Sequence, residues 1–327
     1  MLFRCKNCGG NTVFSPSVGK MYCPHCDGID SEEKEDKGTQ TECVNCGAPL
    51  TIGEYNSTCQ CEYCGSYIIL NERVDGKYRP DLVLPFKIDK KSVVDMLRAE
   101  FKKRIFTPES FLSEATLKDM KGIYVPFWMY DYAARYEYEG KGTKVRVWTT
   151  GDTEYTETSY YRIERDMNVD FDKIPVDASI AMQNDVMDLM EPYDYQQLEG
   201  FAEKYMSGFF GEIYNEDSDT LEDRARTKAN KDMEDLLQGT ISGYTTVVPE
   251  NKNVTMNKKG VHYTLLPVWH YLYKYKDKDY DFYVNGQTGK IIGSTPVSKA
   301  KVLSYGATVF VFAWMALSFI IGILEVI

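Results

Sequence analysis

The sequence lacks most of the motifs on which common enzymes depend. Only three of its 327 residues are histidine, namely His25, His262 and His270, and no H-E-x-x-H zinc motif is present. No G-x-S-x-G nucleophile motif occurs, and no two carboxylates are spaced in a way that marks an acid and base pair. Residues 286–290 lack the spacing and the Ser or Thr of a phosphate-binding loop. We therefore expect no enzymatic activity.

A secretory signal is also missing. Residues 1–4 run directly into Cys5, which leaves no space for the charged and apolar regions of such a signal. We expect the folded part of the chain to stay in the cytosol, where thiols remain reduced. All nine cysteines lie before residue 65, and in that compartment such clustering indicates metal binding instead of a disulfide framework.

Carboxylates outnumber cations, with 49 Asp and Glu against 38 Lys and Arg. The net charge is -11 and the isoelectric point is about 5.0, so the overall field repels phosphate backbones. Residues 1–70 are acidic themselves. Their cations are Arg4, Lys6, Lys20, Lys34 and Lys37, against the carboxylates Asp27, Asp30, Glu32, Glu33, Glu35, Asp36, Glu42, Glu54 and Glu62. We expect no nucleic-acid binding from this segment.

Eight cysteines form two sets with the same spacing. Each set has two C-x2-C pairs separated by fourteen residues, and the second set repeats the first at an offset of 38. Such pairs bring four thiolates around one Zn2+ ion and leave no position for a reactive water, which indicates a structural metal. The sets predict two zinc ribbons, at residues 1–29 and 42–70. The expected ligands are Cys5, Cys8, Cys23 and Cys26 in the first ribbon, and Cys43, Cys46, Cys61 and Cys64 in the second.

The ninth cysteine, Cys59, has no partner in this pattern. At the offset of 38 it aligns with Met21, so we expect a small buried thiol in preference to a redox sensor. His25 lies inside a cysteine pair and is interpreted as a non-ligand. Residues 30–41 are charged and carry no apolar side chain, which predicts an acidic, mobile linker that lets the two ribbons move independently.

Residues 79–298 change to tyrosine-rich strands and amphipathic helices, which predicts a central α+β domain with an antiparallel sheet. We expect strands over residues 123–138, 144–149 and 154–169, with turns at Gly140, Gly142 and Gly151-Asp152. A helix is expected over residues 218–238, capped by Ser218 or Asp219 and ended by Gly239. Its core face would carry Leu221, Ala225, Ala229, Met233 and Leu236.

Another helix is expected over residues 90–105. Its apolar stripe would contain Val93, Val94, Leu97, Phe101 and Ile105, with Lys91, Arg98, Lys102, Lys103 and Arg104 elsewhere on the helix. A solvated basic face is one interpretation. Contact with anionic lipid headgroups is the other, because the helix would be tethered near a bilayer.

The central region contains an internal repeat. Residues 125–132 (VPFWMYDY) resemble residues 266–273 (LPVWHYLY) at an offset of 141. We expect two matching strands, each with its proline at a sheet edge or strand start and with Trp128 or Trp269 in the core. An aromatic binding groove is the alternative. Turn residues at 285–289 also predict a hairpin between residues 280–284 and 290–293.

Residues 306–324 contain no charge, and the apolar stretch extends back to residue 303. A helix over residues 303–324 is long enough to span about 30 Å of hydrocarbon, although a buried core helix is the alternative. Lys299 and Lys301 precede it, so the positive-inside rule predicts a single-pass tail anchor in the cell membrane with the N-terminal bulk in the cytoplasm.

These features together resemble the YdjG-like family of bacterial double-zinc-ribbon membrane proteins. The resemblance is carried by the two ribbons, by Leu84-Pro85-Phe86, and by the segments 124–128, 265–269 and 283–290. It implies a cytosol-facing anchor that works beside SPFH (flotillin-like) and phage-shock-protein-A-like envelope-stress proteins. The family provides no catalytic residues to transfer.

The first functional hypothesis is therefore a membrane adaptor that recruits soluble proteins, with the ribbons as docking modules and the central domain as scaffold. A membrane-tethered nucleic-acid binder is the alternative, since zinc ribbons are common in transcription and replication proteins. An enzyme using a pocket of the tyrosine-rich domain is a third.

Overall fold

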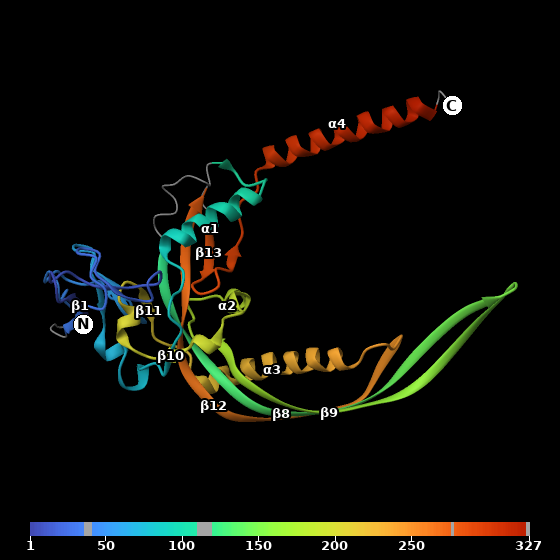
Figure 1. Ribbon diagram of the computed structural model, residues 1–327, viewed down its shortest axis with the longest axis horizontal. Helices are drawn as coiled ribbons and strands as arrows, with labels where there is room; N and C mark the ends of the chain where they lie inside the picture. The colour runs from blue at the N-terminus through green and yellow to red at the C-terminus, as the bar shows by residue number, and fades with distance from the viewer. Residues whose placement is uncertain (36–40, 110–119, 276–277, 325–327) are drawn as a thin grey trace.

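The computed structural model describes residues 1–35, 41–109, 120–275 and 278–324, and it has the expected α+β architecture (Figure 1). Its helices are α1 (Lys90–Lys103), α2 (Asn184–Met190), α3 (Ser218–Thr240) and α4 (Lys299–Leu324). Two small sheets pair β1 (Leu2–Cys5) with β4 (Glu32–Glu35) and β2 (Val13–Ser15) with β3 (Lys20–Tyr22).

One large sheet contains the other described strands, in the order β10-β7-β12-β8-β11-β5-β6, with β9 on β8, β13 on β12 and β14 on β13. These strands are β5 (Asn56–Gln60), β6 (Tyr67–Ile69), β7 (Leu82–Val83), β8 (Lys121–Thr150), β9 (Thr153–Asp177), β10 (Glu199–Gly200), β11 (Phe210–Glu212), β12 (Thr246–Tyr275), β13 (Lys278–Asn285) and β14 (Ile291–Gly293). The predicted hairpin around residues 285–289 is confirmed by the pairing of β13 with β14.

The centre of the sheet is the antiparallel pair β8 and β12, which runs from Thr143 opposite Thr246 to Lys121 opposite His270. Each of these long strands has a short parallel neighbour and an antiparallel one: β11 and β9 beside β8, and β7 and β13 beside β12. The chain thus contains two similar units, β7-α1-β8-β9 and β11-α3-β12-β13. The expected internal repeat is therefore confirmed. The two units exchange their short strands: β7 of the first unit pairs with β12 of the second, and β11 of the second pairs with β8 of the first.

The two repeat prolines lie where the long strands change partner, and not at an edge or a strand start as expected. At Pro126 strand β8 leaves β11 and joins β9, and at Pro267 strand β12 leaves β7 and joins β13. The proline carbonyls accept hydrogen bonds from Ala178 N and Gly286 N, both at 2.9 Å. The nitrogen of each proline faces the gap between the two successive neighbours of its strand. No hydrogen bond of the sheet is lost there, although proline has no N–H.

The two repeat tryptophans occupy equivalent places in the core, as predicted. Trp128 Nε1 donates to Glu216 O at 2.9 Å, and Trp269 Nε1 donates to Ile88 O at 3.0 Å. Each acceptor lies in the loop between a short strand and the helix that follows it. Both rings are packed against other aromatic side chains, which favours the core interpretation over an open aromatic groove.

The helix of each repeat unit packs on the hairpin of the other unit. In α1, Val93, Leu97 and Phe101 are buried, and the Phe101 ring lies 4.9 Å from the ring of Phe282 on β13. Asp89 caps this helix by accepting a hydrogen bond from Ser92 N at 2.8 Å. Ile105 does not join the buried stripe, because α1 ends at Lys103, and its side chain is 57% exposed.

Helix α3 covers the concave side of β8 and β9 (Figure 1). Its buried residues are Leu221, Ala225, Ala229, Met233 and Leu237, whereas the predicted Leu236 is exposed. A constant spacing of four drifts around a helix with 3.6 residues per turn, so the buried stripe follows the twist of the sheet. The N-cap is Asp217 instead of Ser218 or Asp219, and the helix continues past Gly239 to Thr240.

Gly140 and Gly142 lie inside β8 and are not turns. A Cβ atom at Gly140 would lie 2.6 Å from the Tyr138 hydroxyl, and one at Gly142 would lie 2.5 Å from the Tyr244 ring. Glycine is needed there because aromatic side chains pass over the backbone. The expected separate strands are therefore one continuous hairpin, which turns at Gly151 with a φ of 62°.

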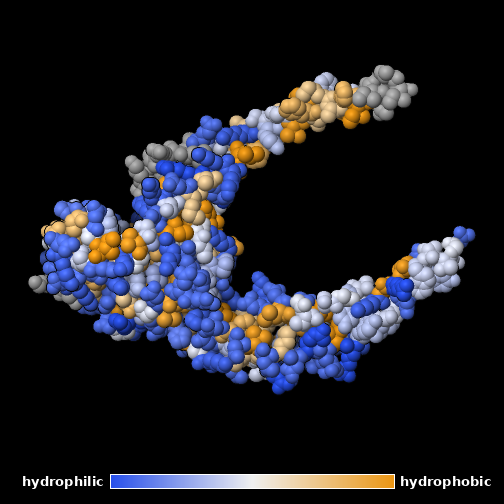
Figure 2. Space-filling view, in the orientation of Figure 1, coloured by the Kyte–Doolittle hydropathy of each residue, from blue (hydrophilic) through white to orange (hydrophobic). Residues whose placement is uncertain are grey.

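Helix α4 projects away from the sheet (Figure 1), and its described side chains beyond Lys301 are exposed. Figure 2 shows apolar residues along this helix. Within the described part of the chain, it is the one helix that is long and apolar enough to cross a membrane. Its complete exposure argues against the alternative of a buried core helix.

Buried charges connect α2 and α3 to the end of β9. Asp177 is fully buried and lies 2.7 Å from the Arg224 guanidinium, which also contacts Asp188 at 2.8 Å. Lys228 bridges Asp188 and Glu191. Burial raises the pKa of Asp177, and the charge of Arg224 opposes this shift.

We predict that Arg224→Met lowers the free energy of unfolding by about 3 kcal/mol, because it leaves a buried carboxylate without its partner. The folded-state pKa of Asp177 then rises further above its unfolded value, so stability is lost as the pH rises from the unfolded pKa towards the raised folded pKa, and the deficit is larger at about pH 8 than at about pH 5. Denaturant unfolding of the full chain in detergent tests this. Arg162→Ala, at an exposed ion pair, is the control and should change stability by less than about 1 kcal/mol. An Arg224→Met deficit as small as the control, or independent of pH, would contradict the prediction.

Candidate metal centres

All eight predicted ligands lie in short turns with the same hydrogen-bond pattern. In the first turn, Gly9 N donates to Cys5 O at 2.8 Å and Cys5 N donates to Gly10 O at 2.8 Å. The turns at Cys23, Cys43 and Cys61 repeat these two bonds. The fourth residue after the first cysteine has a left-handed backbone in every turn: Gly9, Asp27, Gly47 and Gly65 have φ values of 59° to 74°. Asp27 takes the place of glycine in one turn, as a short polar side chain can.

The turns bring the cysteines together in the two predicted groups of four. All Sγ atoms within a group lie within 4.8 Å of one another. The Cys5–Cys26 and Cys8–Cys23 pairs are 3.6 Å apart, and the second group has 3.6 Å for Cys43–Cys64 and 3.7 Å for Cys46–Cys61. A tetrahedral ion with metal–sulfur bonds of about 2.3 Å requires sulfur separations near ~3.8 Å. Each group can therefore hold one metal ion, with all four positions taken by protein.

A serine supports one thiol in each group. The Ser31 hydroxyl lies 3.4 Å from Cys5 Sγ and, as the largest influence, lowers the pKa of that thiol to about 6. Burial raises the pKa of Cys64, but hydrogen bonds from the Ser66 side chain and backbone outweigh it and lower the pKa to about 6. Thiolate is the form that binds metal, and the serine contacts favour it at Cys5 and Cys64.

Other thiols of the two groups are shifted in the opposite direction. The Gly28 backbone lowers the pKa of Cys26, but contacts with Cys8 and Cys5 outweigh it and raise that pKa to about 12. Burial raises the pKa of Cys43 to about 12. The thiols of a group therefore do not all favour the thiolate.

The predicted linker is partly folded. Glu32–Glu35 forms strand β4 and pairs with β1, while residues 36–40 lie outside the described residues. Arg4 of β1 donates to Glu35 at 2.5 Å and to Asn45, inside a cysteine turn of the second ribbon, at 2.8 Å. The backbone of this stretch pairs with β1 and the Glu35 carboxylate binds Arg4, which explains why a segment without apolar residues is ordered there.

The two ribbons do not move independently, because they share a core. Leu2 of the first ribbon is buried against Cys43, Cys59 and Ile68 of the second. The Met1 backbone exchanges hydrogen bonds with Ile69 of β6, from N to O at 2.5 Å and from O to N at 2.9 Å. The N-terminus, through Met1 and Leu2, therefore contacts both ribbons.

Both ribbons are also joined to the large sheet. Strand β5 of the second ribbon pairs with β11, and β11 pairs with β8. In the first ribbon, Phe14 N donates to Ser207 O at 2.8 Å, and the Phe14 ring lies 5.1 Å from that of Tyr205. The ribbons and the central domain, expected as separate units with a boundary near residues 70–79, form one continuous structure.

Cys59 and Met21 are both buried, as the alignment of the repeats predicts. Burial raises the pKa of the Cys59 thiol, which keeps it in its less reactive protonated form. His25 is not in either four-cysteine group. The other histidines contact carboxylates: His262 lies 3.4 Å from Asp131 and His270 lies 3.0 Å from Asp281. Metal-ligand groups in the described residues are limited to the two cysteine sets.

Several cations of the ribbons are neutralised by neighbouring carboxylates. Arg4 pairs with Glu35, Lys20 pairs with Asp30 at 2.6 Å, and Lys34 lies 3.4 Å from Glu203. Cations that are already paired offer little to a phosphate backbone.

The structure contains a surface that sequence reasoning missed. Strand β12 begins at Thr246, opposite Thr143, so residues 144–159 of the β8–β9 hairpin pair only with each other. This two-stranded segment, which we call the arm, extends beyond the end of α3 (Figure 1).

The arm is not predicted from the sequence because turns are expected at Gly140 and Gly142, which lie inside β8. The expected strands 144–149 and 154–169 and the expected turn at Gly151-Asp152 are present. However, no local signal at Gly140 and Gly142 indicates that the strand ending at residue 138 continues through them.

One face of the arm and its base carries exposed aromatic rings with cations over them. Trp148 stacks on Tyr155 at 5.6 Å, and the Arg146 guanidinium lies 5.5 Å from the Trp148 ring. At the base of the arm, Lys144 Nζ lies 5.3 Å from the rings of both Tyr161 and Tyr244. Trp148 and Tyr155 are 40% and 46% exposed. Aromatic side chains and Arg are the residues that contribute most to protein interfaces.

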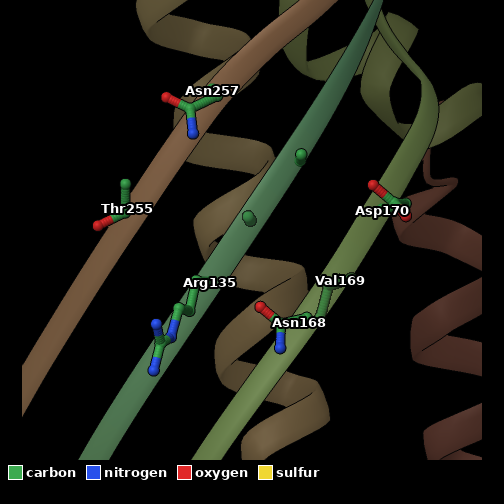
Figure 3. Close-up of a pocket in the computed structure, with 8 residues that line it drawn as sticks. Arg135, Asn168, Val169, Asp170, Thr255 and Asn257 are labelled. Atoms are coloured by element: carbon green, nitrogen blue, oxygen red, sulfur yellow. The ribbon is translucent and has the colours of Figure 1, made fainter.

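The depression in Figure 3 lies across β12, β8 and β9 and is open to solvent. Its polar lining includes Thr255, Asn257 and Asp170. The Arg135 guanidinium is taken by Asp166 at 2.8 Å and by Glu137 at 2.9 Å. We find no nucleophile beside a base among the residues that line this depression.

We predict that the full chain binds two equivalents of metal and that Cys43→Ser or Cys23→Ser lowers this to about one, because a three-thiolate shell binds the ion far more weakly. Cys59→Ala is the matched control and should retain both ions, since Cys59 belongs to neither group. Plasma mass spectrometry on purified protein measures the metal content. Two ions in Cys43→Ser, or one in Cys59→Ala, would refute the assignment.

Comparison with known proteins supports the family label that the sequence suggests. No protein-family model and no solved structure matches the chain. The uncharacterised protein YdjG of Bacillus subtilis (strain 168) is 34% identical over 314 residues, which cover 93% of this chain and 92% of YdjG. With this identity over nearly the whole of both sequences, the chain belongs to the YdjG family.

Proposed function

We propose that this protein is a non-catalytic adaptor, anchored in the cell membrane by α4, that recruits soluble proteins to the inner face of that membrane. The observation that carries the proposal is the arm, which holds exposed aromatic and cationic side chains on a pair of strands that belongs to the same sheet as β14, the strand before α4. A surface of this kind has no role in the packing of the chain, and large exposed aromatic patches mark interaction sites.

We propose zinc as the metal in both cysteine groups, with a structural role. Four thiolates in a tetrahedral arrangement suit zinc or iron, and closed four-cysteine shells are typical of structural zinc. Each ion would fix two turns, and through them β1 and β5. The metal thus supports the fold that presents the arm, and it takes no part in a reaction.

The cytosolic orientation is supported by charge. Lys299 and Lys301 lie in the first turn of α4, on the side of the folded domain. Cations flanking a membrane helix favour the cytosolic side. The ribbons lie on the other side of the sheet from α4 (Figure 1), so this orientation exposes them to cytosolic proteins. The arm extends in the same direction as α4, so its exposure to the cytosol requires α4 to turn about residues 294–298, which form neither helix nor strand.

For partners we propose SPFH (flotillin-like) and phage-shock-protein-A-like proteins, which the family resemblance implies. The ribbons are integrated into the sheet, and this makes the arm a better docking candidate than a mobile ribbon. Nucleic acid is not favoured, because the ribbons are acidic and their main cations are ion-paired.

We predict that shortening the arm abolishes partner capture without unfolding the domain. Lys144 and Ser159 are opposite each other, and Thr143 turns its carbonyl to β12. The hydrogen-bonded pair across the arm is therefore Lys144–Ser159, and replacing residues 145–158 with Asn-Gly closes a two-residue hairpin. Crosslinked affinity capture from detergent-solubilised membranes should recover SPFH-like or phage-shock-protein-A-like proteins with the wild-type chain only. Equal recovery with the shortened arm would exclude the arm as the docking surface.

A finer pair of variants separates the arm's two faces. Trp148→Ala removes an aromatic side chain that stacks on Tyr155, and it should weaken capture by about tenfold or more, as loss of an interface hot spot does. Tyr160→Ala is the matched control, because Tyr160 is 79% exposed and lies on the opposite face. It should leave capture unchanged, and a loss as large as that of Trp148→Ala would count against a docking site on the aromatic face.

A further inference from the structure

We propose that the C-terminal end of α1 and the first turn of α4 together form a binding site for anionic lipid headgroups. The proposal rests on the membrane anchoring by α4 described above. It concerns Lys102, Lys103 and Ile105 at the end of α1, and Lys299 and Lys301 at the start of α4.

The two helices are held together at this point by specific contacts. Ser298 N donates to Phe106 O at 2.8 Å, and Lys301 Nζ donates to Thr107 O at 3.0 Å. The ring of Phe106 packs edge-on against that of Tyr305 at 5.5 Å. The end of α1 is therefore fixed beside the first turn of α4. If α4 spans the membrane, this end lies at the level of the headgroups.

This part of the surface is rich in cations. Lys102, Lys103 and Arg104 are consecutive, and Lys299 and Lys301 lie across from them on α4. Glu100 contacts both Lys103 and Arg104 at 3.5 Å, and Glu109 lies 3.6 Å from Lys301. None of the described carboxylates pairs with Lys102 or Lys299. The cations exceed the carboxylates, and a surface with such an excess attracts anionic lipids.

The exposed side chain of Ile105 favours a lipid-binding site over a basic helix face that contacts only solvent. Its side chain is 57% exposed although it directly follows the cations, and Tyr305 on α4 is 53% exposed. Cations in the last turn of a helix also offset the helix dipole, but that role needs no exposed isoleucine. An apolar side chain among lysines, with a tyrosine at the same level, is the arrangement of interfacial membrane segments.

Lysine reactivity in membranes of known composition tests the proposal. The full chain is reconstituted into vesicles of phosphatidylcholine alone, or of equal parts phosphatidylcholine and phosphatidylglycerol. A water-soluble acylating reagent then modifies exposed lysines, and peptide mass spectrometry gives the rate at each one. We expect Lys102, Lys103 and Lys299 to react about fivefold more slowly with phosphatidylglycerol present, and Lys141 and Lys252 to react equally in both. Equal rates at Lys102 and Lys103 in the two membranes would overturn the proposal.

Charge reversal gives a second measurement with a control on the same helix. Lys102→Glu/Lys103→Glu should reduce the number of phosphatidylglycerol molecules retained in native mass spectrometry. Lys90→Glu/Lys91→Glu makes the same charge change at the other end of α1, where acidic residues favour a helix start, and it should retain them. Equal loss in both variants would overturn the site. Extraction of the chain from vesicles by alkaline carbonate would instead show that the anchoring itself fails.

Discussion

The antiparallel ladder between β8 and β12 is the contact on which the rest of the structure depends. Each of the two strands provides the attachment for the short strand of the opposite repeat unit, and each unit's helix packs on the other unit's hairpin. Neither unit can complete its sheet alone. The exchanged arrangement also explains Pro126 and Pro267, since a proline is tolerated in a central strand where its neighbour changes.

The metal groups extend this arrangement to the N-terminus. Strand β5 lies between the second ribbon's cysteine turns and joins the sheet through β11. Leu2 connects the first ribbon to the buried core of the second ribbon. Four thiolates around an ion replace the apolar contacts that such small units lack. In the proposed adaptor, the metal therefore stabilises one continuous platform, and it does not create two mobile docking modules.

Local patterns in the sequence predicted the features that local chemistry determines. The cysteine spacing predicted the two groups of four that the structure brings together, residues 285–289 predicted a hairpin, and the apolar run predicted α4. Long-range packing determined what was missed. Gly140 and Gly142 are in β8 because Tyr138 and Tyr244 cross over them, and the charged Glu32–Glu35 is a strand because β1 pairs with it. Leu237 replaces Leu236 in the core because α3 follows a twisted sheet. Apart from Tyr138, which is two residues from Gly140, these partners are distant in the sequence, so no local pattern specifies them.

The proposed function requires the arm and the ribbons to lie on the cytosolic side of a membrane crossed by α4. Asp152 is exposed in the turn at the tip of the arm, so Asp152→Cys provides a reporter that lies apart from the native cysteines. A membrane-impermeant maleimide can be applied to right-side-out and inside-out vesicles, and peptide mass spectrometry locates the label. The account predicts labelling at residue 152 in inside-out vesicles only. Labelling in right-side-out vesicles would place the arm outside the cell and contradict the account.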